Sequence, residues 1–387
     1  MRKLRADWIF AAPELLPDAV LVLDDTGTVV TVRPALPEDI DCEVYPGLIC
    51  PAFVNAHCHL ELSHLRGAIP PRTGMAGFVQ QLQAVRSNFS DEERERAINE
   101  AAQAMWQRGV SAVGDICNAN HTRAVKSTLP QMHWHNFIEL FGSHPGRAEE
   151  IFMAGFALAE EMGPSSTITL HAPYSVSAAL RDRVHEYASI RGWRQSIHLL
   201  ESTEERELFE SLEGPLMDML RRFGLVFQGH THESPIDYIL EGCDPVMPLL
   251  LVHNTEMDVE EMEAIVAAFP WVFFVLCPRA NAYIHGTTPP AGQFAAHPDR
   301  VCLGTDSLAG NTTLDIYAEM QALQEHSGLA PATILRWGTL NGANALGIPE
   351  TRFRIAPGNR PDLLHLPEVK GTDPKLPHAA LIIRLEP

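Results

Sequence analysis

The sequence has no apolar run as long as a membrane span, which needs roughly 18 unbroken apolar residues. Hydrophobic residues make up 45% of its 387 residues and charged residues 20%, as in ordinary globular proteins. The N-terminus has a basic start, but Asp7, Pro13 and Glu14 interrupt it before an apolar segment of signal-peptide length is reached. We therefore expect a soluble, cytoplasmic protein that has no membrane partner.

Basic clusters and paired cysteine motifs are also absent. With a formal net charge of −20 the chain would repel a polyanion, which argues against nucleic acid as a partner. The seven cysteines are an odd number, lack CxxC spacing and lie mostly in apolar strand-like runs, so we expect buried free thiols. A small molecule is the expected ligand. The sequence does not fix the oligomeric state, and a homodimer, the commonest symmetric assembly, stays open.

From residue 48 onward, short β-rich apolar runs alternate with segments of helical period, a pattern typical of parallel α/β folds. The eight runs are Leu48 to His57, Gly109 to Cys117, Met132 to Phe141, Thr167 to His171, Arg194 to Leu199, Met247 to His253, Val272 to Cys277 and Arg300 to Asp306. Credible helices lie between them, one opening with a capping box at Ser90 and Glu93 and another opening at Ser177. The pattern favours a (β/α)8 TIM-type barrel over residues 48–351.

The two flanks of this region differ from it. Residues 1–47 carry alternating patches such as AVLVLDDTGTVVTV, with Asp-Thr-Gly as a hairpin turn, and residues 352–387 end in HAALIIRLEP. Both flanks predict strands. We expect residues 1–47 and 352–387 to form one small β-sandwich-like domain beside the barrel.

The polar residues that matter most lie where predicted strands end, because the C-terminal strand ends of a β/α barrel build its active site. His57 and His59 close the first run, His198 the fifth, His253 the sixth and Asp306 the eighth. Alternation along a strand places His57 and His59 on one face, where they can hold a metal ion at roughly 2.1 Å per Zn–N bond. Cys58 then points away and serves packing.

Two similar triplets show how little an HxH pattern proves by itself. His133-x-His135 begins its predicted strand, at the end opposite the expected active site, and His230-x-His232 lies in a polar loop before Ser-Pro. Position therefore assigns both triplets a structural role.

Four further residues extend the expected site. His198 can supply a third nitrogen ligand, and Asp306 an oxygen ligand that also accepts a proton from water at the metal, although an Asp at this place can instead cap a helix. His253 can polarise the water or the developing oxygen, the alternative being a core histidine. Glu201, in His198-Leu-Leu-Glu201, suits general acid–base catalysis near the metal.

Lysine is scarce, and its positions limit the number of metal ions. Binuclear enzymes of this architecture bridge two ions with a carboxylated lysine on the fourth strand, but the only lysines are Lys3, Lys126, Lys370 and Lys375. The corresponding stretch has His171 instead, so one divalent ion is expected. We predict His171 as a substrate contact, with a core or capping role as the alternative.

Together these residues resemble the amidohydrolase superfamily, in particular its mononuclear ring-deaminase branch, which contains cytosine, guanine, S-adenosylhomocysteine and aminofutalosine deaminases. The resemblance covers nearly the whole chain through the motifs PGLICPAFVNAHCHLELSHLRG, HAPYSVS, SIHLLE, LVHNTEM, LCPRAN and LGTDSLAGN. It implies a deaminase of an amino-substituted heteroaromatic ring, with one metal ion, zinc before iron or manganese. The residues that it makes metal ligands are His57, His59, His198 and Asp306.

The resemblance also implies roles in the reaction. Glu201 would carry a proton to a ring nitrogen, and His253 and Asp306 would activate the water that attacks the amino-bearing carbon, so that ammonia leaves. The HLELS segment is similar to the HLE-x-S of aminofutalosine deaminases of the alternative menaquinone pathway, which makes Glu61 a substrate contact. Its alternative is a salt-bridged loop carboxylate.

One segment departs from the family pattern. S-adenosylhomocysteine deaminases carry a Trp and a ribose-binding Glu where this chain has Phe78, Gln80 and Gln81, which argues against an identical adenosyl pocket. Two other functions stay open at this point. One is chlorohydrolase or amide hydrolase chemistry at the same metal, and the other is an inactive barrel with a structural or regulatory role.

Overall fold

The computed structural model of the chain describes residues 1–387 apart from residues 228, 230–233, 371–373, 379 and 387. It is a mixed α/β fold with one six-stranded sheet and two four-stranded parallel sheets. The six-stranded sheet joins strands from both ends of the chain in the order β14-β13-β4-β1-β2-β3. Its strands are β1 (Arg2–Ala11), β2 (Glu14–Leu23), β3 (Val29–Pro34), β4 (Glu43–Pro51), β13 (Leu363–Leu366) and β14 (Ile383–Leu385).

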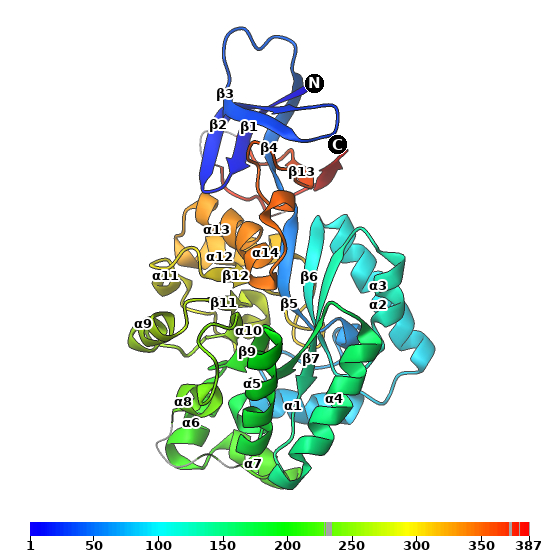
Figure 1. Ribbon diagram of the computed structural model, residues 1–387, viewed down its shortest axis with the longest axis vertical. Helices are drawn as coiled ribbons and strands as arrows, with labels where there is room; N and C mark the ends of the chain where they lie inside the picture. The colour runs from blue at the N-terminus through cyan, green and yellow to red at the C-terminus, as the bar shows by residue number, and fades with distance from the viewer. Residues whose placement is uncertain (228, 230–233, 371–373, 379, 387) are drawn as a thin grey trace.

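The six-stranded sheet places both termini side by side, at the top of Figure 1. Strands β2 and β3 are antiparallel, and the carboxylate of Asp24 accepts hydrogen bonds from the N–H groups of Thr26 and Thr28 in the turn between them. The predicted hairpin is therefore confirmed. Leu4, Leu21 and Leu363, from three of these strands, share one apolar cluster beneath the sheet.

The prediction of a single strand over Leu48 to His57 is wrong. Residues 48–51 end β4 and pair with β13 in the six-stranded sheet, and a new strand, β5 (Phe53–Cys58), follows. The backbone changes partner between two adjacent residues. Ala52 donates its N–H to Asp362, next to β13, whereas Phe53 donates to Gly109, next to β6. Both strands are buried at this point, so the sequence is apolar on either side of this change, and its mark is Pro51, the last residue of β4, which lacks the N–H that a strand ladder needs.

The two four-stranded sheets are parallel, in the orders β5-β6-β7-β8 and β12-β11-β10-β9. Their remaining strands are β6 (Val110–Cys117), β7 (His133–Leu140), β8 (Ser166–Leu170), β9 (Gln195–Leu199), β10 (Leu249–His253), β11 (Val272–Leu276) and β12 (Val301–Leu303). Each overlaps one of the seven other predicted runs. The strands are buried on both faces, which explains why they appear in the sequence as continuous apolar runs.

Backbone hydrogen bonds link the edges of the two parallel sheets. His198, at the end of β9, donates its N–H to the carbonyl oxygen of His171 just after β8, at 2.9 Å. Thr305, after β12, donates to the carbonyl oxygen of His57 in β5, also at 2.9 Å. These bonds bring the C-terminal ends of β5, β8, β9 and β12 together, and the polar side chains at those ends with them.

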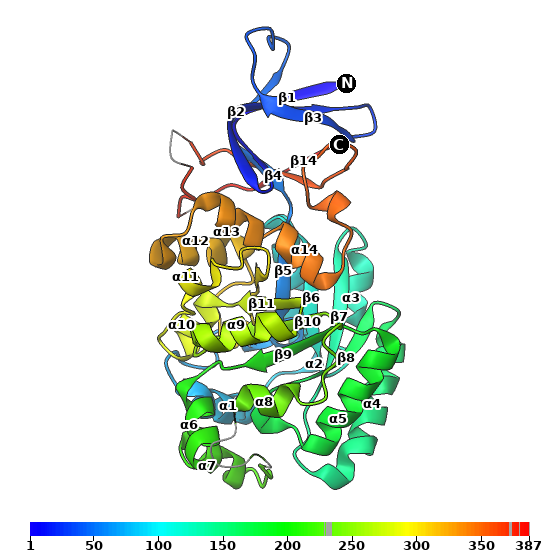
Figure 2. The same cartoon turned by 60° about the vertical axis from the view of Figure 1, so that its left-hand side comes forward.

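Helices lie outside the parallel strands, as Figures 1 and 2 show. The helices of eight or more residues are α1 (Gly74–Val85), α2 (Asp91–Gln107), α4 (Ala148–Met162), α5 (Ala178–Arg191), α6 (Thr203–Ser211), α7 (Pro215–Arg222), α9 (Val259–Ala268) and α12 (Ile316–Ser327). The shorter ones are α3 (Arg123–Thr128), α8 (Pro235–Leu240), α10 (Pro278–Ile284), α11 (Ala291–Phe294), α13 (Pro331–Trp337), α14 (Leu340–Leu346), and the 3-10 helices η1 (Leu60–Leu65), η2 (Pro145–Arg147), η3 (Pro173–Ser175) and η4 (Glu350–Arg352).

Two helix starts were predicted from capping residues, and both are confirmed. Ser90 and Glu93 form the reciprocal hydrogen bonds of a capping box at the start of α2. The hydroxyl of Ser177 accepts from the N–H of Leu180 at the start of α5. Among the described helices, none combines the length and apolar character that crossing a membrane requires. All seven cysteines are free thiols, and six of them are buried, close to what the sequence predicts.

Candidate metal centre and acid–base site

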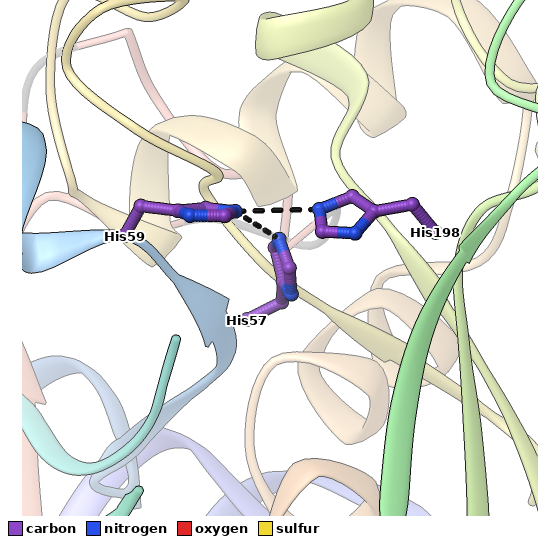
Figure 3. Close-up of side chains that lie close together, drawn as sticks. All are labelled: His57, His59 and His198. Carbon is purple, nitrogen blue, oxygen red and sulfur yellow. Dashed lines mark hydrogen bonds between the residues drawn. The ribbon is translucent and has the colours of Figure 1, made fainter. Parts of the chain in front are cut away.

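Three imidazole rings from two strands converge at one point (Figure 3). His57 and His59 come from the end of β5, where alternation of side chains turns both to the same face, and His198 comes from β9. The Nε2 atom of His59 lies 3.1 Å from Nε2 of His57 and 3.3 Å from Nε2 of His198. All three residues are buried. The structure therefore brings together the three histidines that the sequence predicts.

Asp306, which follows β12, brings a carboxylate to the same group. Its Oδ1 atom lies 3.5 Å from Nε2 of His59 and 4.0 Å from Nε2 of His57. Residues 304–306 lie close to β5. A Cβ atom at Gly304 would lie 2.8 Å from the Cβ of His57, so glycine is required there. The side-chain amide of Asn55 also binds the hydroxyl of Thr305 at 2.8 Å and holds the segment in place.

The donor set fits one divalent metal ion. Four ligands at about 2.1 Å from a tetrahedral ion lie about 3.4 Å from one another, close to three of the four distances given above, 3.1, 3.3 and 3.5 Å. Burial lowers the pKa of His57 and of His59 well below the ordinary value, so both imidazoles are neutral and offer lone pairs. Cys58 belongs to none of the potential ligand groups among the described residues, in agreement with the packing role predicted for it.

Glu139, which the sequence analysis missed, lies beside His198. Atom Nδ1 of His198 lies 3.1 Å from the carbonyl oxygen of His171 and 3.4 Å from Oε1 of Glu139, so Nδ1 carries the proton and Nε2 stays free for the ion. The side-chain amide of Asn118 donates to Oε2 of Glu139 at 3.1 Å. The signal that the sequence offered was a glutamate in the apolar run of β7, next to the C-terminal end of that strand.

His253 and Glu201 form a pair beside the metal ligands. Oε2 of Glu201 lies 3.5 Å from Nε2 of His253, and the ring of His253 stacks on that of His198 with centroids 5.4 Å apart. Nδ1 of His253 lies 3.3 Å from Oδ1 of Asn281, which makes Nδ1 the protonated nitrogen. Asn281 is the last residue of the LCPRAN motif. The sequence analysis gives this residue no role.

A second imidazole contacts the same carboxylate. Nε2 of His285, the residue that ends α10, lies 3.3 Å from Oε1 of Glu201. Burial by itself would raise the pKa of Glu201, but His253 and His285 outweigh it and lower that pKa to about 2. The carboxylate is therefore charged at neutral pH. The sequence analysis missed His285, because a lone histidine in a loop after a short helix carries no signal.

His171 lies at the edge of this group. Its Nδ1 atom contacts the hydroxyl of Ser175 at 2.7 Å, which leaves Nε2 available to another molecule. The centroid of its ring lies 4.9 Å from that of His198 and 6.0 Å from that of Phe141, and Phe141 is 52% exposed. Burial lowers the pKa of His171 to about 4, so the ring is neutral. This position agrees with a substrate contact, which stays a prediction.

Glu61, the other predicted substrate contact, lies in η1 and is buried. Its Oε2 atom accepts from the backbone N–H groups of Asn118 at 3.1 Å and Ala119 at 3.3 Å, and thus holds the loop after β6. Burial and the nearby Asp115 raise the pKa of Glu61 to about 8. These contacts are with backbone amides rather than with a basic side chain. The role of Glu61 as a substrate contact likewise stays a prediction.

The remaining histidine triplets and lysines lie elsewhere. His133 and His135 start β7, at the end away from Glu139, and His135 contacts the hydroxyl of Thr167 at 3.1 Å, as expected of a structural residue. His230 and His232 lie outside the described residues. Strand β8 contains no lysine, and Lys126 instead binds Asp115 and Asn136.

Comparison with known proteins gives a consistent result. Residues 48–383 match the sequence model of the Amidohydrolase family. The chain is 27% identical over 318 residues to an aminodeoxyfutalosine deaminase of Deinococcus radiodurans, which covers 78% of this chain and 73% of that protein. It is 24% identical over 347 residues to a 5-methylthioadenosine/S-adenosylhomocysteine deaminase of Teredinibacter turnerae, covering 82% and 72%.

The fold is also similar to that of a solved protein. The structure of Helicobacter pylori aminofutalosine deaminase in complex with methylthio-coformycin superposes with a TM-score of 0.79 at 23% sequence identity. The similarity covers 94% of this chain and 91% of that one. At this identity the likeness shows the fold alone.

Proposed function

The chain belongs to the amidohydrolase family, as a hydrolase of carbon–nitrogen bonds other than peptide bonds, and we propose that it is a metal-dependent deaminase of an adenine-type nucleoside. The observation that carries this proposal is the convergence of three imidazole Nε2 atoms and one carboxylate oxygen next to a carboxylate held between two further imidazoles. The first part of this arrangement suits a metal ion and the second suits proton transfer.

The metal ion in this proposal is held by His57, His59, His198 and Asp306. Three nitrogen ligands and one oxygen ligand suit zinc, and also iron or manganese. When bound, the ion acts as a Lewis acid that lowers the pKa of water. Strand β8 contains no lysine that could bridge two ions, so the site is proposed to hold a single ion.

The residues beside the ligands move the protons. Glu201 is a charged carboxylate within reach of His253, so it can accept a proton from the attacking water and deliver it to the ring nitrogen next to the amino-bearing carbon. His253 keeps its Nε2 directed into the site because Asn281 occupies Nδ1. Nε2 of His253 and the carboxylate of Asp306 can accept the second proton of that water and pass it to the amino group. That group then leaves as ammonia, and the carbon keeps the oxygen.

The substrate assignment rests on the relatives. The two curated relatives described above are named as deaminases of aminodeoxyfutalosine and of methylthioadenosine and S-adenosylhomocysteine. We place aminofutalosine-type nucleosides, and with them menaquinone biosynthesis, first among the candidates. His171 and Glu61 are the proposed substrate contacts, His171 through its available Nε2 atom.

The fold completes the proposal. The hydrogen bonds between the edges of the two parallel sheets support a closed (β/α)8 barrel over residues 48–351. The six-stranded sheet supports a small β-domain made of residues 1–47 and 352–387, with β4 connecting it to the barrel. In such a barrel the C-terminal strand ends carry the chemistry, which is where the metal ligands lie.

The test is ammonia release by metal-loaded protein from aminodeoxyfutalosine, S-adenosylhomocysteine, methylthioadenosine and adenosine. We expect ammonia from at least one of them and stoichiometric metal by elemental analysis. His198→Ala should lose both metal and activity, whereas the matched control His133→Ala, which changes a histidine at the far end of β7, should keep both.

Three outcomes would contradict the proposal. Bound metal with no ammonia from any of these substrates argues against the deaminase. Chloride or amine release from triazines or amides, without ammonia, indicates another reaction at the same metal. Absence of metal from the wild type and from His133→Ala indicates an inactive barrel.

A further inference from the structure

The carboxylate of Glu201 is held from two sides. Oε2 faces Nε2 of His253 at 3.5 Å, and Oε1 faces Nε2 of His285 at 3.3 Å. The two imidazoles come from different elements, the end of β10 and the C-terminus of α10. The side chains of all three residues are at least nine-tenths buried, so water competes little for these contacts.

Such anchoring matters because the last torsion of a glutamate side chain is soft. The rotation of the carboxylate plane has a broad, roughly two-fold energy profile, so an unanchored carboxylate samples many orientations. A group that takes a proton from water and gives it to a ring nitrogen must point its lone pairs in fixed directions. Loss of alignment by about 1 Å costs on the order of 10²-fold in rate.

We infer that His285 is a positioning residue, which fixes the carboxylate plane of Glu201 for proton transfer by donating its Nε2–H to Oε1. The inference rests on the proposed deaminase function. It adds a second imidazole to the side of the carboxylate that His253 does not reach.

One face of α10 serves both imidazoles. Asn281 and His285 are four residues apart, one turn of helix, so they lie on the same face. Asn281 holds Nδ1 of His253 through its Oδ1 atom, and His285 contacts Glu201 directly. The backbone N–H of His285 donates to the carbonyl oxygen of Asn281 at 2.8 Å and fixes their spacing. The short helix thus supports Glu201 from both of its sides.

The end of α10 is itself fastened to the loop before α1. The phenol of Tyr283 donates to the carbonyl oxygen of Ile69 at 2.6 Å, and the N–H of Arg72 donates to the carbonyl oxygen of Tyr283 at 2.7 Å. Gly286 ends the helix with a φ of 79°, in the left-handed region that favours glycine. His285 therefore sits on a braced turn rather than on a free loop.

The test compares His285→Leu, which removes the donor, with His285→Gln, whose amide nitrogen can replace Nε2. We expect the leucine variant to lower kcat by about 10²-fold with KM little changed, and the glutamine variant to recover most of that loss. The matched controls are His297→Leu and His297→Gln, since Nε2 of His297 also contacts a carboxylate, Oε1 of Glu263 at 2.9 Å, on the exposed surface. Both should behave as wild type.

Crystal structures of the metal-loaded proteins give a readout that is independent of activity. In the wild type, Glu201 should have one carboxylate orientation, with Oε1 within hydrogen-bond distance of His285. In His285→Leu the carboxylate should rotate or occupy several orientations while the metal ligands stay in place. An unchanged Glu201 in that variant overturns the inference, and so does an equal loss of kcat in both substitutions.

The two proposals fail separately. If the wild-type protein releases no ammonia from any substrate, the deaminase assignment fails, and the orientation of Glu201 in the two crystal structures still decides the role of His285. If ammonia is released but KM rises with kcat unchanged in His285→Leu, the residue contacts the substrate and does not position Glu201.

Discussion

The three histidines that would hold the metal ion differ in backbone conformation from Asp306 and the residues that would move protons. His57 and His198 lie inside β-strands, and His59 follows β5 with a φ of −107°. By contrast, His253 and Asp306 have positive φ values, 75° and 55°. Glu201 directly follows Leu200, whose φ is 51°. None of the three histidine ligands thus has a positive φ, whereas Asp306, the fourth proposed ligand, and the acid–base residues lie in or next to left-handed turns.

The left-handed turns carry a cost that the extended strands do not. A non-glycine residue in this region costs on the order of 1–3 kcal/mol and persists only where surrounding contacts hold it. Here the contacts are specific. Asn254, with a φ of 53°, donates its N–H to the carbonyl oxygen of Leu199, and Glu256 donates to that of Leu200. Asp306 donates its N–H to the carbonyl oxygen of His57.

The difference shows what each part of the site depends on. Strand alternation is enough to turn His57 and His59 toward a common point, so these two proposed ligands need little beyond the sheet. The proton-transfer residues depend on turns that leave the strand direction and on second contacts from Asn281 and His285. Mutations should therefore separate the two parts, metal binding from turnover.

The largest difference between metal binding and turnover is expected when Glu201→Gln is compared with His57→Ala. The glutamine keeps the shape of the side chain but cannot carry the proton, so kcat should fall by about 10²–10⁴-fold while the metal stays bound. His57→Ala should lose the ion itself. Ammonia release and elemental analysis on the same samples measure both effects. Loss of metal from Glu201→Gln would show that the two parts are not separate.

A smaller effect is expected from Glu139→Gln, which acts on the metal side through His198. The neutral amide holds the Nδ1 proton less well than the carboxylate, so metal affinity or activity should fall by about 10–100-fold. Competition with a chelator measures the affinity. Glu161→Gln is the matched control, because Glu161 also accepts from an asparagine amide, that of Asn120, but on the exposed surface. Equal metal affinity in Glu139→Gln and Glu161→Gln would show that Glu139 does not support the metal site.

Much of the fold followed from the sequence, for a physical reason. A parallel strand that is buried on both faces must be apolar throughout, and seven of the eight predicted runs each overlap a single strand of the structure. The exception, the run that begins at Leu48, contains two strands. Its backbone changes partner at Ala52 and Phe53, and that change depends on Asp362 and Gly109, which are distant in sequence.

The candidate site was predictable to the same extent. The sequence predicts that His57, His59, His198 and Asp306 lie together, and the structure brings them together because the C-terminal ends of parallel strands face one side of the fold. Their role as metal ligands stays a prediction. Glu139 and His285 could not be identified, because their roles depend on contacts with His198 and Glu201, across more than fifty residues of sequence. Positive φ values at His253 and Asp306 have no sequence signature either, since neither residue is glycine.

The smallest effect concerns the turn at Leu200, and it depends on pH. Oε2 of the buried Glu205 accepts the backbone N–H of Glu201 at 3.1 Å and so supports the left-handed turn. Burial raises the pKa of Glu205 to about 8, above its ordinary value near 4.5. Between these values the folded protein keeps a proton that the unfolded chain releases. Stability is therefore complete below about pH 4.5 and decreases as the pH rises toward about 8.

Glu205→Gln should remove this contribution, because an amide does not titrate. The free energy of unfolding, measured in urea at about pH 5, 6 and 7, should decrease with pH in the wild type by up to about 1.4 kcal/mol per pH unit more than in the variant. Glu210→Gln, on the exposed side of α6, is the control and should keep the wild-type slope. If Glu205→Gln keeps it too, Glu205 is ionised in the fold, and the turn beside Glu201 is held by a charged carboxylate.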